Sequence, residues 1–73
     1  MTAPAVKRPT RAEVLREYAV EGRHGYDAWD ILCRRAPAKR VTFVLQRLVD
    51  DGLMECGVTV QGGWLTEKGR AAL

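Results

Sequence analysis

The alternation of apolar and polar residues predicts a first helix that begins at Thr10 and ends at Gly22. Apolar side chains recur in this stretch at three- and four-residue intervals, which is typical of a helix with one buried face. The Thr10 hydroxyl and the Glu13 carboxylate have the Thr-x-x-Glu spacing of a capping box, in which each side chain accepts a hydrogen bond from a backbone N–H of the first turn. Gly22 supplies the usual stop signal.

Two further helices are expected, over residues 26–34 and residues 37–51. The second is short and has aromatic residues near its start, whereas the third opens with Pro37, which suits a first helical turn. The third helix has the clearest apolar stripe in the chain, at spacings i, i+3, i+4 and i+7: Val41, Val44, Leu45 and Leu48.

A small β-hairpin is expected after the third helix. Residues 53–56 have strand character that continues in 58–60, the Gln-Gly-Gly sequence is a turn, and residues 64–65 form the returning strand. Residues 66–73 complete the chain as a short helical turn, whose final Ala71, Ala72 and Leu73 are expected to pack on the domain. The sequence therefore predicts three helices, a hairpin and a terminal helical turn.

The length and composition fit one mainly helical domain. The chain has 73 residues, of which 47% are hydrophobic and 29% charged, so it has the composition of a folded globular protein. We assign residues 10–73 to this domain. Residues 1–9 hold two of the three prolines and almost no apolar periodicity, and we expect them to form a flexible basic arm.

The charge distribution favours a polyanionic partner for the first two-thirds of the chain. Residues 1–47 carry ten Lys or Arg against five Asp or Glu, a net charge of +5, whereas residues 48–73 carry two against four, a net charge of −2. A positive surface attracts nucleic acid and raises its rate of association. An ordinary solvated surface with a basic bias is the alternative.

The side of the third helix opposite its apolar stripe is a candidate for DNA reading. Two helices joined by a short turn, the second of them basic and amphipathic, form a helix-turn-helix, and the second helix fits the major groove of B-DNA. At 100° per residue, this side offers cations for phosphate, an amide that can read adenine and an arginine that can read guanine. The base-facing candidates are Lys39, Thr42, Phe43, Gln46 and Arg47, with Thr42 on the flank.

Phe43 is unexpected in the middle of this polar side. A large exposed apolar side chain indicates an interface. Three interpretations are open: contact with a thymine methyl group, packing under the N-terminal arm, or contact with a partner subunit.

Two segments resemble winged helix-turn-helix regulators of bacteria, in the style of the MarR, PadR and ArsR families. Residues 41–54 are similar to their recognition helix and first wing strand, with the pattern Leu-x-x-Leu-x-x-x-Gly-Leu, and residues 64–70 to the second wing strand and its Leu-Thr-x-x-Gly turn. The resemblance covers residues 10–73. It implies a winged-helix fold, binding of double-stranded DNA, transcription regulation of bacterial or phage type, and a cytoplasmic, nucleoid-associated location.

One departure from these families concerns the wing. Residues 52–65 contain no Lys or Arg, although the wing tip of many winged helices carries a basic residue that contacts DNA. Phosphate contacts are therefore expected from elsewhere in the basic part of the chain, with Lys39 as a further contributor. The backbone-contacting candidates are Lys7, Arg8, Arg11, Arg34, Arg35 and Arg40.

The second hypothesis is a winged-helix module that binds protein instead of DNA, as an adaptor, an assembly part or a phage protein directed at a host complex. The wing without basic residues and Phe43 favour it, since fold alone does not dictate function. A homodimer or another protein partner would use Phe43, Trp64 or the C-terminal end.

No candidate for catalysis or metal binding stands out. The chain has no serine and one histidine, His24, and Cys33 lies in an apolar run that would raise the pKa of its thiol. Cys33 and Cys56 are expected to be reduced and largely buried, without metal-binding spacing. We expect no enzyme activity, no cofactor, no metal and no membrane span.

Overall fold

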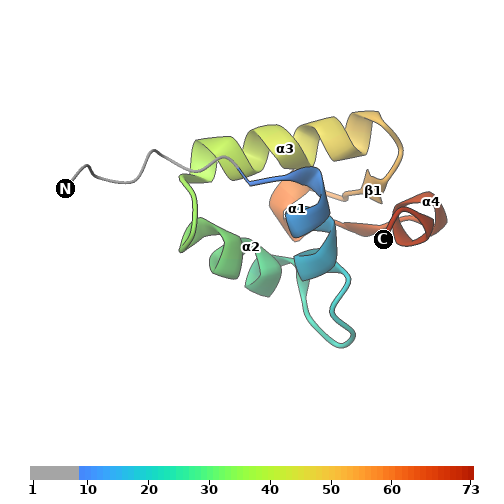
Figure 1. Ribbon diagram of the computed structural model, residues 1–73, viewed down its shortest axis with the longest axis horizontal. Coiled ribbons are helices and arrows are strands. Elements are labelled where there is room, and N and C mark those ends of the chain that lie inside the picture. Colours follow the sequence, from blue (N-terminus) through green and yellow to red (C-terminus); the bar gives the residue numbers. More distant parts are fainter. Residues whose placement is uncertain (1–8) are drawn as a thin grey trace.

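The computed structural model describes residues 9–73, which form a mainly helical structure with a two-stranded antiparallel sheet (Figure 1). Helices α1, α2 and α3 come first, and the strands follow on either side of a short 3-10 helix, η1. A last short helix, α4, ends the chain. Their bounds are α1 Arg11–Tyr18, α2 Gly25–Cys33, α3 Ala38–Asp50, β1 Met54–Glu55, η1 Val60–Gly62, β2 Trp64–Leu65 and α4 Glu67–Ala71.

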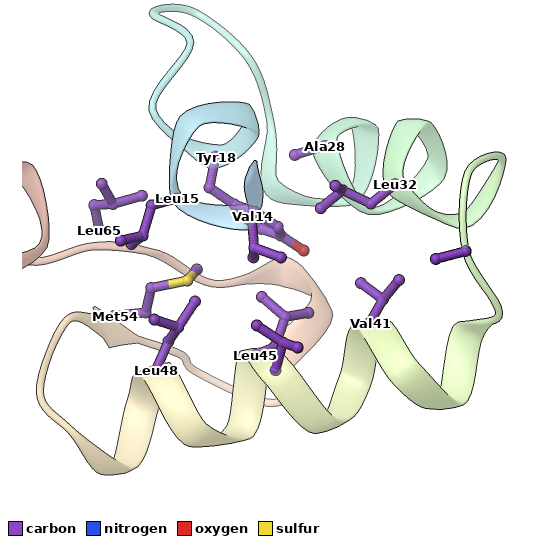
Figure 2. Close-up of a cluster of buried hydrophobic side chains, with 12 residues drawn as sticks. Val14, Leu15, Tyr18, Ala28, Leu32, Val41, Leu45, Leu48, Met54 and Leu65 are labelled. Atoms are coloured by element: carbon purple, nitrogen blue, oxygen red, sulfur yellow. The ribbon is translucent and has the colours of Figure 1, made fainter. Parts of the chain in front are cut away.

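The hydrophobic core lies between α3 and the pair α1 and α2. Val41, Leu45 and Leu48 project from α3 toward these two helices, and Met54 of β1 and Leu65 of β2 close the core at the sheet (Figure 2). The whole predicted stripe of α3 is buried, and Val41, Leu45 and Leu48 are fully so. Each such side chain contributes about 1.5–3 kcal/mol by leaving water. The apolar pattern of α3 is thereby confirmed, and it fixes which side of the helix meets solvent.

The predicted start of α1 is confirmed, but its predicted end is wrong. The Thr10 hydroxyl accepts a hydrogen bond from the Glu13 N–H at 3.1 Å, and the Thr10 N–H donates to the Glu13 carboxylate at 3.2 Å. The helix ends at Tyr18, four residues before Gly22. The Arg23 guanidinium donates to the Glu17 carbonyl at 3.2 Å, so a side chain replaces the helical partner there, and Gly22 supports the following turn with a φ of 77°.

Helices α2 and α3 lie within one residue of their expected bounds. His24 caps α2, since its Nδ1 accepts a hydrogen bond from the Tyr26 N–H at 3.3 Å. Pro37 precedes α3 at the N-cap position, and no side chain caps that end. The connection between the two helices, residues 34–37, has the length of a helix-turn-helix turn.

The predicted hairpin is present: its returning strand is confirmed at residues 64–65, but its first strand is much shorter than expected. The two strands have two residues each, with Met54 opposite Leu65 and Glu55 opposite Trp64. The expected strand over residues 58–60 is wrong, because residues 60–62 form η1, which packs against α2 and α3. The Tyr18 hydroxyl donates to the Gln61 carbonyl at 2.7 Å and the Tyr26 hydroxyl lies 2.6 Å from the Thr59 hydroxyl, so tertiary contacts draw this segment onto the helices.

Helix α4 packs against the rest of the domain through Gly69, whereas its last residues are exposed. The Thr66 hydroxyl caps it by accepting from the Gly69 N–H at 3.1 Å, and Gly69 is buried. The expected packing of Ala71, Ala72 and Leu73 on the domain is wrong, because all three are exposed. The short helix turns its one residue without a side chain toward the Leu53 backbone, which leaves the following apolar residues outside.

The Tyr18 hydroxyl should make the stability of the domain pH-dependent in alkali. Burial, and then the neighbouring Cys33 and Tyr26, raise the pKa of Tyr18 above its ordinary value of 10. As the pH rises, Tyr18 therefore ionises in the unfolded protein before it ionises in the folded protein. Below about pH 10 the hydroxyl is neutral in both states, and its contribution to the free energy of unfolding is complete. Above that pH the free energy of unfolding falls by about 1.4 kcal/mol per pH unit until the folded hydroxyl also titrates.

The measurement is urea unfolding of the protein and of Tyr18→Phe between about pH 8 and about pH 11. At the lower pH the variant should be less stable by about 1–3 kcal/mol, since the Gln61 carbonyl loses its donor. The gap between the two proteins should then narrow as the pH rises. A stability difference that stays constant over this pH range would contradict the raised pKa of Tyr18.

Candidate nucleic-acid interface

The solvent-facing side of α3 carries most of the residues predicted to face DNA bases. Lys39, Phe43, Gln46 and Arg47 are exposed, and Phe43 keeps 55% of its surface accessible. They stand opposite the buried stripe because both sets come from one helix with a 100° step. Helix α3 lies along one edge of the molecule, so no other described element covers this side (Figure 1).

Thr42 lies at the border of this surface, as its flank position predicted. Its side chain is half-buried, and its hydroxyl lies 3.4 Å from the Gln61 side-chain nitrogen, which donates to it. This contact holds Thr42 toward η1 and leaves it less available to a ligand than its four neighbours. The sequence could not reveal the contact, since Gln61 is 19 residues away.

Three cations surround the start of α3: Arg34, Lys39 and Arg40. They lie in the α2–α3 loop and in the first turn of α3, and all are exposed. Among residues 9–73, none of them forms an ion pair with a carboxylate. They are therefore ready to bind an anion without first breaking an internal contact.

Two other predicted phosphate-binding residues already have acidic partners. Arg11 of α1 is paired with Asp51, just after α3. Arg35 is paired with Glu17 at 3.0 Å, and the same carboxylate is bound by Arg23 at 2.5 Å. The Arg11–Asp51 pair joins α1 to the residue after α3, and the Arg35–Glu17 pair joins α1 to the loop before α3. Both arginines therefore have a structural role as well. Lys7 and Arg8 lie outside the described residues.

The charges at the start of α3 oppose its helix dipole. Its first turn holds cations and no acidic residue, and its N-terminal N–H groups lack a side-chain cap. The C-terminal end is mixed, since Asp50 opposes the dipole whereas Arg47 in the last turn and the Lys68 ammonium on the Asp51 carbonyl favour it. The N-terminus of a helix carries partial positive charge, so cations there cost about 0.3–1 kcal/mol each at low salt. A local arrangement that opposes stability is typical of a functional site. This arrangement gains stability when an anion binds beside the N-terminus.

Phe43 borders a shallow groove between α3 and the start of α1. The groove is lined by Pro9, Thr10 and Arg11 on one side, and by Phe43, Val44 and Arg47 on the other. The Arg47 guanidinium lies over the Phe43 ring, 6.0 Å from its centroid, in a cation–π contact. Contact with a thymine methyl group, packing under the N-terminal arm and contact with a partner subunit each remain predictions for Phe43.

A second exposed apolar surface lies beside the loop between β1 and β2. Val58 is fully exposed, Trp64 and Tyr26 are about half-exposed at 50% and 47%, and Tyr26 stacks on His24 with their centroids 5.7 Å apart. This surface has no Lys or Arg between residues 52 and 65. The sequence indicates Trp64 as an interface residue but not Tyr26 or Val58, because long-range contacts place the loop that carries Val58 beside Tyr26.

The two cysteines are free thiols, and both are half-buried instead of largely buried. Burial, and secondarily Asp30, raise the pKa of the Cys33 thiol, which confirms the direction expected from its apolar surroundings. Within residues 9–73 no cluster of three His, Cys, Asp or Glu side chains is arranged to hold a metal ion. In the same part of the chain, no helix combines the length and the apolar character needed to cross a bilayer.

Comparisons with known protein families, with curated proteins and with solved structures gave no match.

Proposed function

We propose that this chain is a winged-helix DNA-binding protein, a transcription regulator of bacterial or phage type, that places α3 in the major groove of double-stranded DNA. The exposed side of α3 would face the bases, and the cations around its start would contact phosphates. The fold assignment rests on the order of three helices, two antiparallel strands and a short last helix. The loop between the strands would be a reduced wing with little part in binding.

The observation that carries this proposal is the start of α3. An uncapped helix end with Arg34, Lys39 and Arg40 around it, none in an ion pair within residues 9–73, opposes the stability of the free protein. Phosphate groups relieve this opposition, since they accept from backbone N–H groups and pair with cations at the same time. Cations elsewhere on the surface would not oppose a helix dipole, so an anion bound there would not relieve such an opposition.

The direct test is titration of a fluorescently labelled random-sequence duplex with the full chain at several salt concentrations, followed by anisotropy. Binding is expected at low salt, and the logarithm of the association constant should fall linearly with the logarithm of the salt concentration. Affinity that is independent of salt would contradict the proposal, because phosphate contacts release counterions.

Arg40→Ala should weaken binding to every duplex sequence. The variant lacks one phosphate contact, so the slope of log affinity against log salt should become shallower by about 0.9. Arg70→Ala is the matched control: it removes an exposed arginine from α4, which lies at the other end of the molecule from the start of α3 (Figure 1). Equal slopes for the two variants would show that the start of α3 is not the contact region.

A protein-binding module is the second candidate, favoured by the apolar surface of Tyr26, Val58 and Trp64 beside a wing without cations. Exposed aromatic and apolar side chains that lie together are characteristic of protein interfaces. The same titration separates the two candidates. A protein-binding module shows no affinity for any duplex at low salt, whereas the DNA-binding proposal requires it.

A further inference from the structure

Two side-chain pairs with i, i+4 spacing lie on the exposed side of α3. The Gln46 amide nitrogen donates to the Asp50 carboxylate at 3.1 Å, and Arg47 lies over the Phe43 ring. The first pair draws Gln46 toward the C-terminal end of α3, and the second draws Arg47 toward its N-terminal end. The two side chains that can read bases therefore diverge along the helix, although they are neighbours in the sequence.

The contact with Asp50 fixes which way the Gln46 amide faces. An ionised carboxylate only accepts hydrogen bonds, so the atom that faces Asp50 must be the amide nitrogen. One of its two N–H groups is used by Asp50. The other N–H and the Gln46 carbonyl oxygen remain, and this donor–acceptor pair matches adenine, whose N7 accepts and whose N6 amino group donates in the major groove.

Asp50 has no evident benefit for α3 other than this contact. A carboxylate near the C-terminus of a helix opposes the dipole, and a carboxylate on a DNA-binding surface repels phosphate. Arg47 is three residues away and could neutralise Asp50, yet its guanidinium lies over Phe43. Among the ion pairs of residues 9–73, none includes Asp50. Within this part of the chain, the Asp50 carboxylate thus lies unpaired by any cation beside Gln46, where it accepts a hydrogen bond from the amide.

From this geometry we infer that Asp50 is a positioning residue for Gln46, and that the DNA bound by this chain has an adenine opposite the C-terminal half of α3. The inference rests on the proposed binding of α3 to the major groove. Gln46 is the specificity-determining residue, Asp50 holds its amide in the orientation for adenine, and Arg47 reads a separate position nearer the start of α3.

The first experiment finds the adenine. A pool of duplexes with a randomised centre is bound by the full chain, and the retained duplexes are sequenced for the unaltered protein and for Gln46→Ala. One adenine position should be enriched by the unaltered protein and not by the variant. Replacing that adenine with 7-deazaadenine, which lacks the N7 acceptor and so removes one of the two hydrogen bonds, should then weaken binding of the unaltered protein by about 2- to 10-fold.

The second experiment separates positioning from charge, with Asp50→Ala and Asp50→Asn as a matched pair. Both variants lose the negative charge, so both should bind all duplexes more tightly. Asp50→Ala also loses the acceptor, and its preference for adenine at the selected position should fall by about 2- to 10-fold. Asp50→Asn keeps a carbonyl acceptor but adds an amide donor, so the Gln46 amide can face it either way, and its preference should fall less than that of Asp50→Ala. Circular dichroism of both variants checks that the helix content of the protein is unchanged.

The outcomes distinguish this inference from the proposed function. If the unaltered protein binds no duplex, the proposed function fails. If it binds DNA but Gln46→Ala leaves the selected sequences unchanged, the DNA-binding proposal stands and the inference is overturned. Equal loss of adenine preference in both Asp50 variants would also overturn it, because charge and not the hydrogen bond would then be responsible.

Discussion

Leu45→Ala is expected to lower the free energy of unfolding by about 2–5 kcal/mol. Leu45 is fully buried at the middle of the α3 stripe, between the helix and its α1 and α2 neighbours (Figure 2). The substitution removes the transfer free energy of the side chain and leaves a cavity that a close-packed core fills only in part. Since small domains are stable by only about 5–15 kcal/mol, a large part of the total would be lost. Urea unfolding followed by circular dichroism measures the change.

The matched control is Gln46→Ala, one residue along the helix but on its exposed side. Alanine is a good helix former, and this site makes only a surface contact with Asp50, so the free energy of unfolding should change by less than about 0.5 kcal/mol. The two variants should also differ in DNA binding. Leu45→Ala loses affinity in proportion to its unfolded fraction, whereas Gln46→Ala remains folded and loses sequence preference. Similar stability of the two variants would contradict the orientation of α3.

The helices that the sequence predicted best are those determined by local signals. The stripe of α3 and the Thr10–Glu13 capping box depend on residues within two turns of each other, and both are confirmed. The end of α1 and the course of residues 56–63 depend on long-range contacts instead. Tyr18, for example, binds the backbone of Gln61, 43 residues away, and no local pattern contains that information.

The candidate site was predictable in its exposure but not in its pairing. A helical wheel is enough to place Lys39, Gln46 and Arg47 on the open side of α3. It cannot show that Arg11 is held by Asp51, 40 positions later, or that Arg35 is held by Glu17 of α1. The contact between Gln46 and Asp50 has the i, i+4 spacing that stabilises helices, so the sequence did contain a signal for it.

Gly69→Ala is expected to lower the free energy of unfolding by about 2–4 kcal/mol, against the direction that helix propensity predicts. Gly69 lies in α4, where alanine would on local grounds stabilise the helix by about 1 kcal/mol. In the fold, a Cβ at this position would lie 2.0 Å from the Leu53 carbonyl oxygen. That oxygen accepts a hydrogen bond from the Thr66 N–H at 3.1 Å, so it cannot move away without loss. We expect α4 to detach or the strand ends to shift.

The sign of this effect distinguishes tertiary packing from local propensity, and urea unfolding measures it. Gly57→Ala is the control, because a Cβ at Gly57 would have no other atom within 4 Å and the residue has no positive φ, so alanine there should be neutral or stabilising by up to about 1 kcal/mol. If Gly69→Ala raised the free energy of unfolding as Gly57→Ala does, α4 would not be packed against Leu53. In that case α4 would not stabilise the position of the two strands relative to α3.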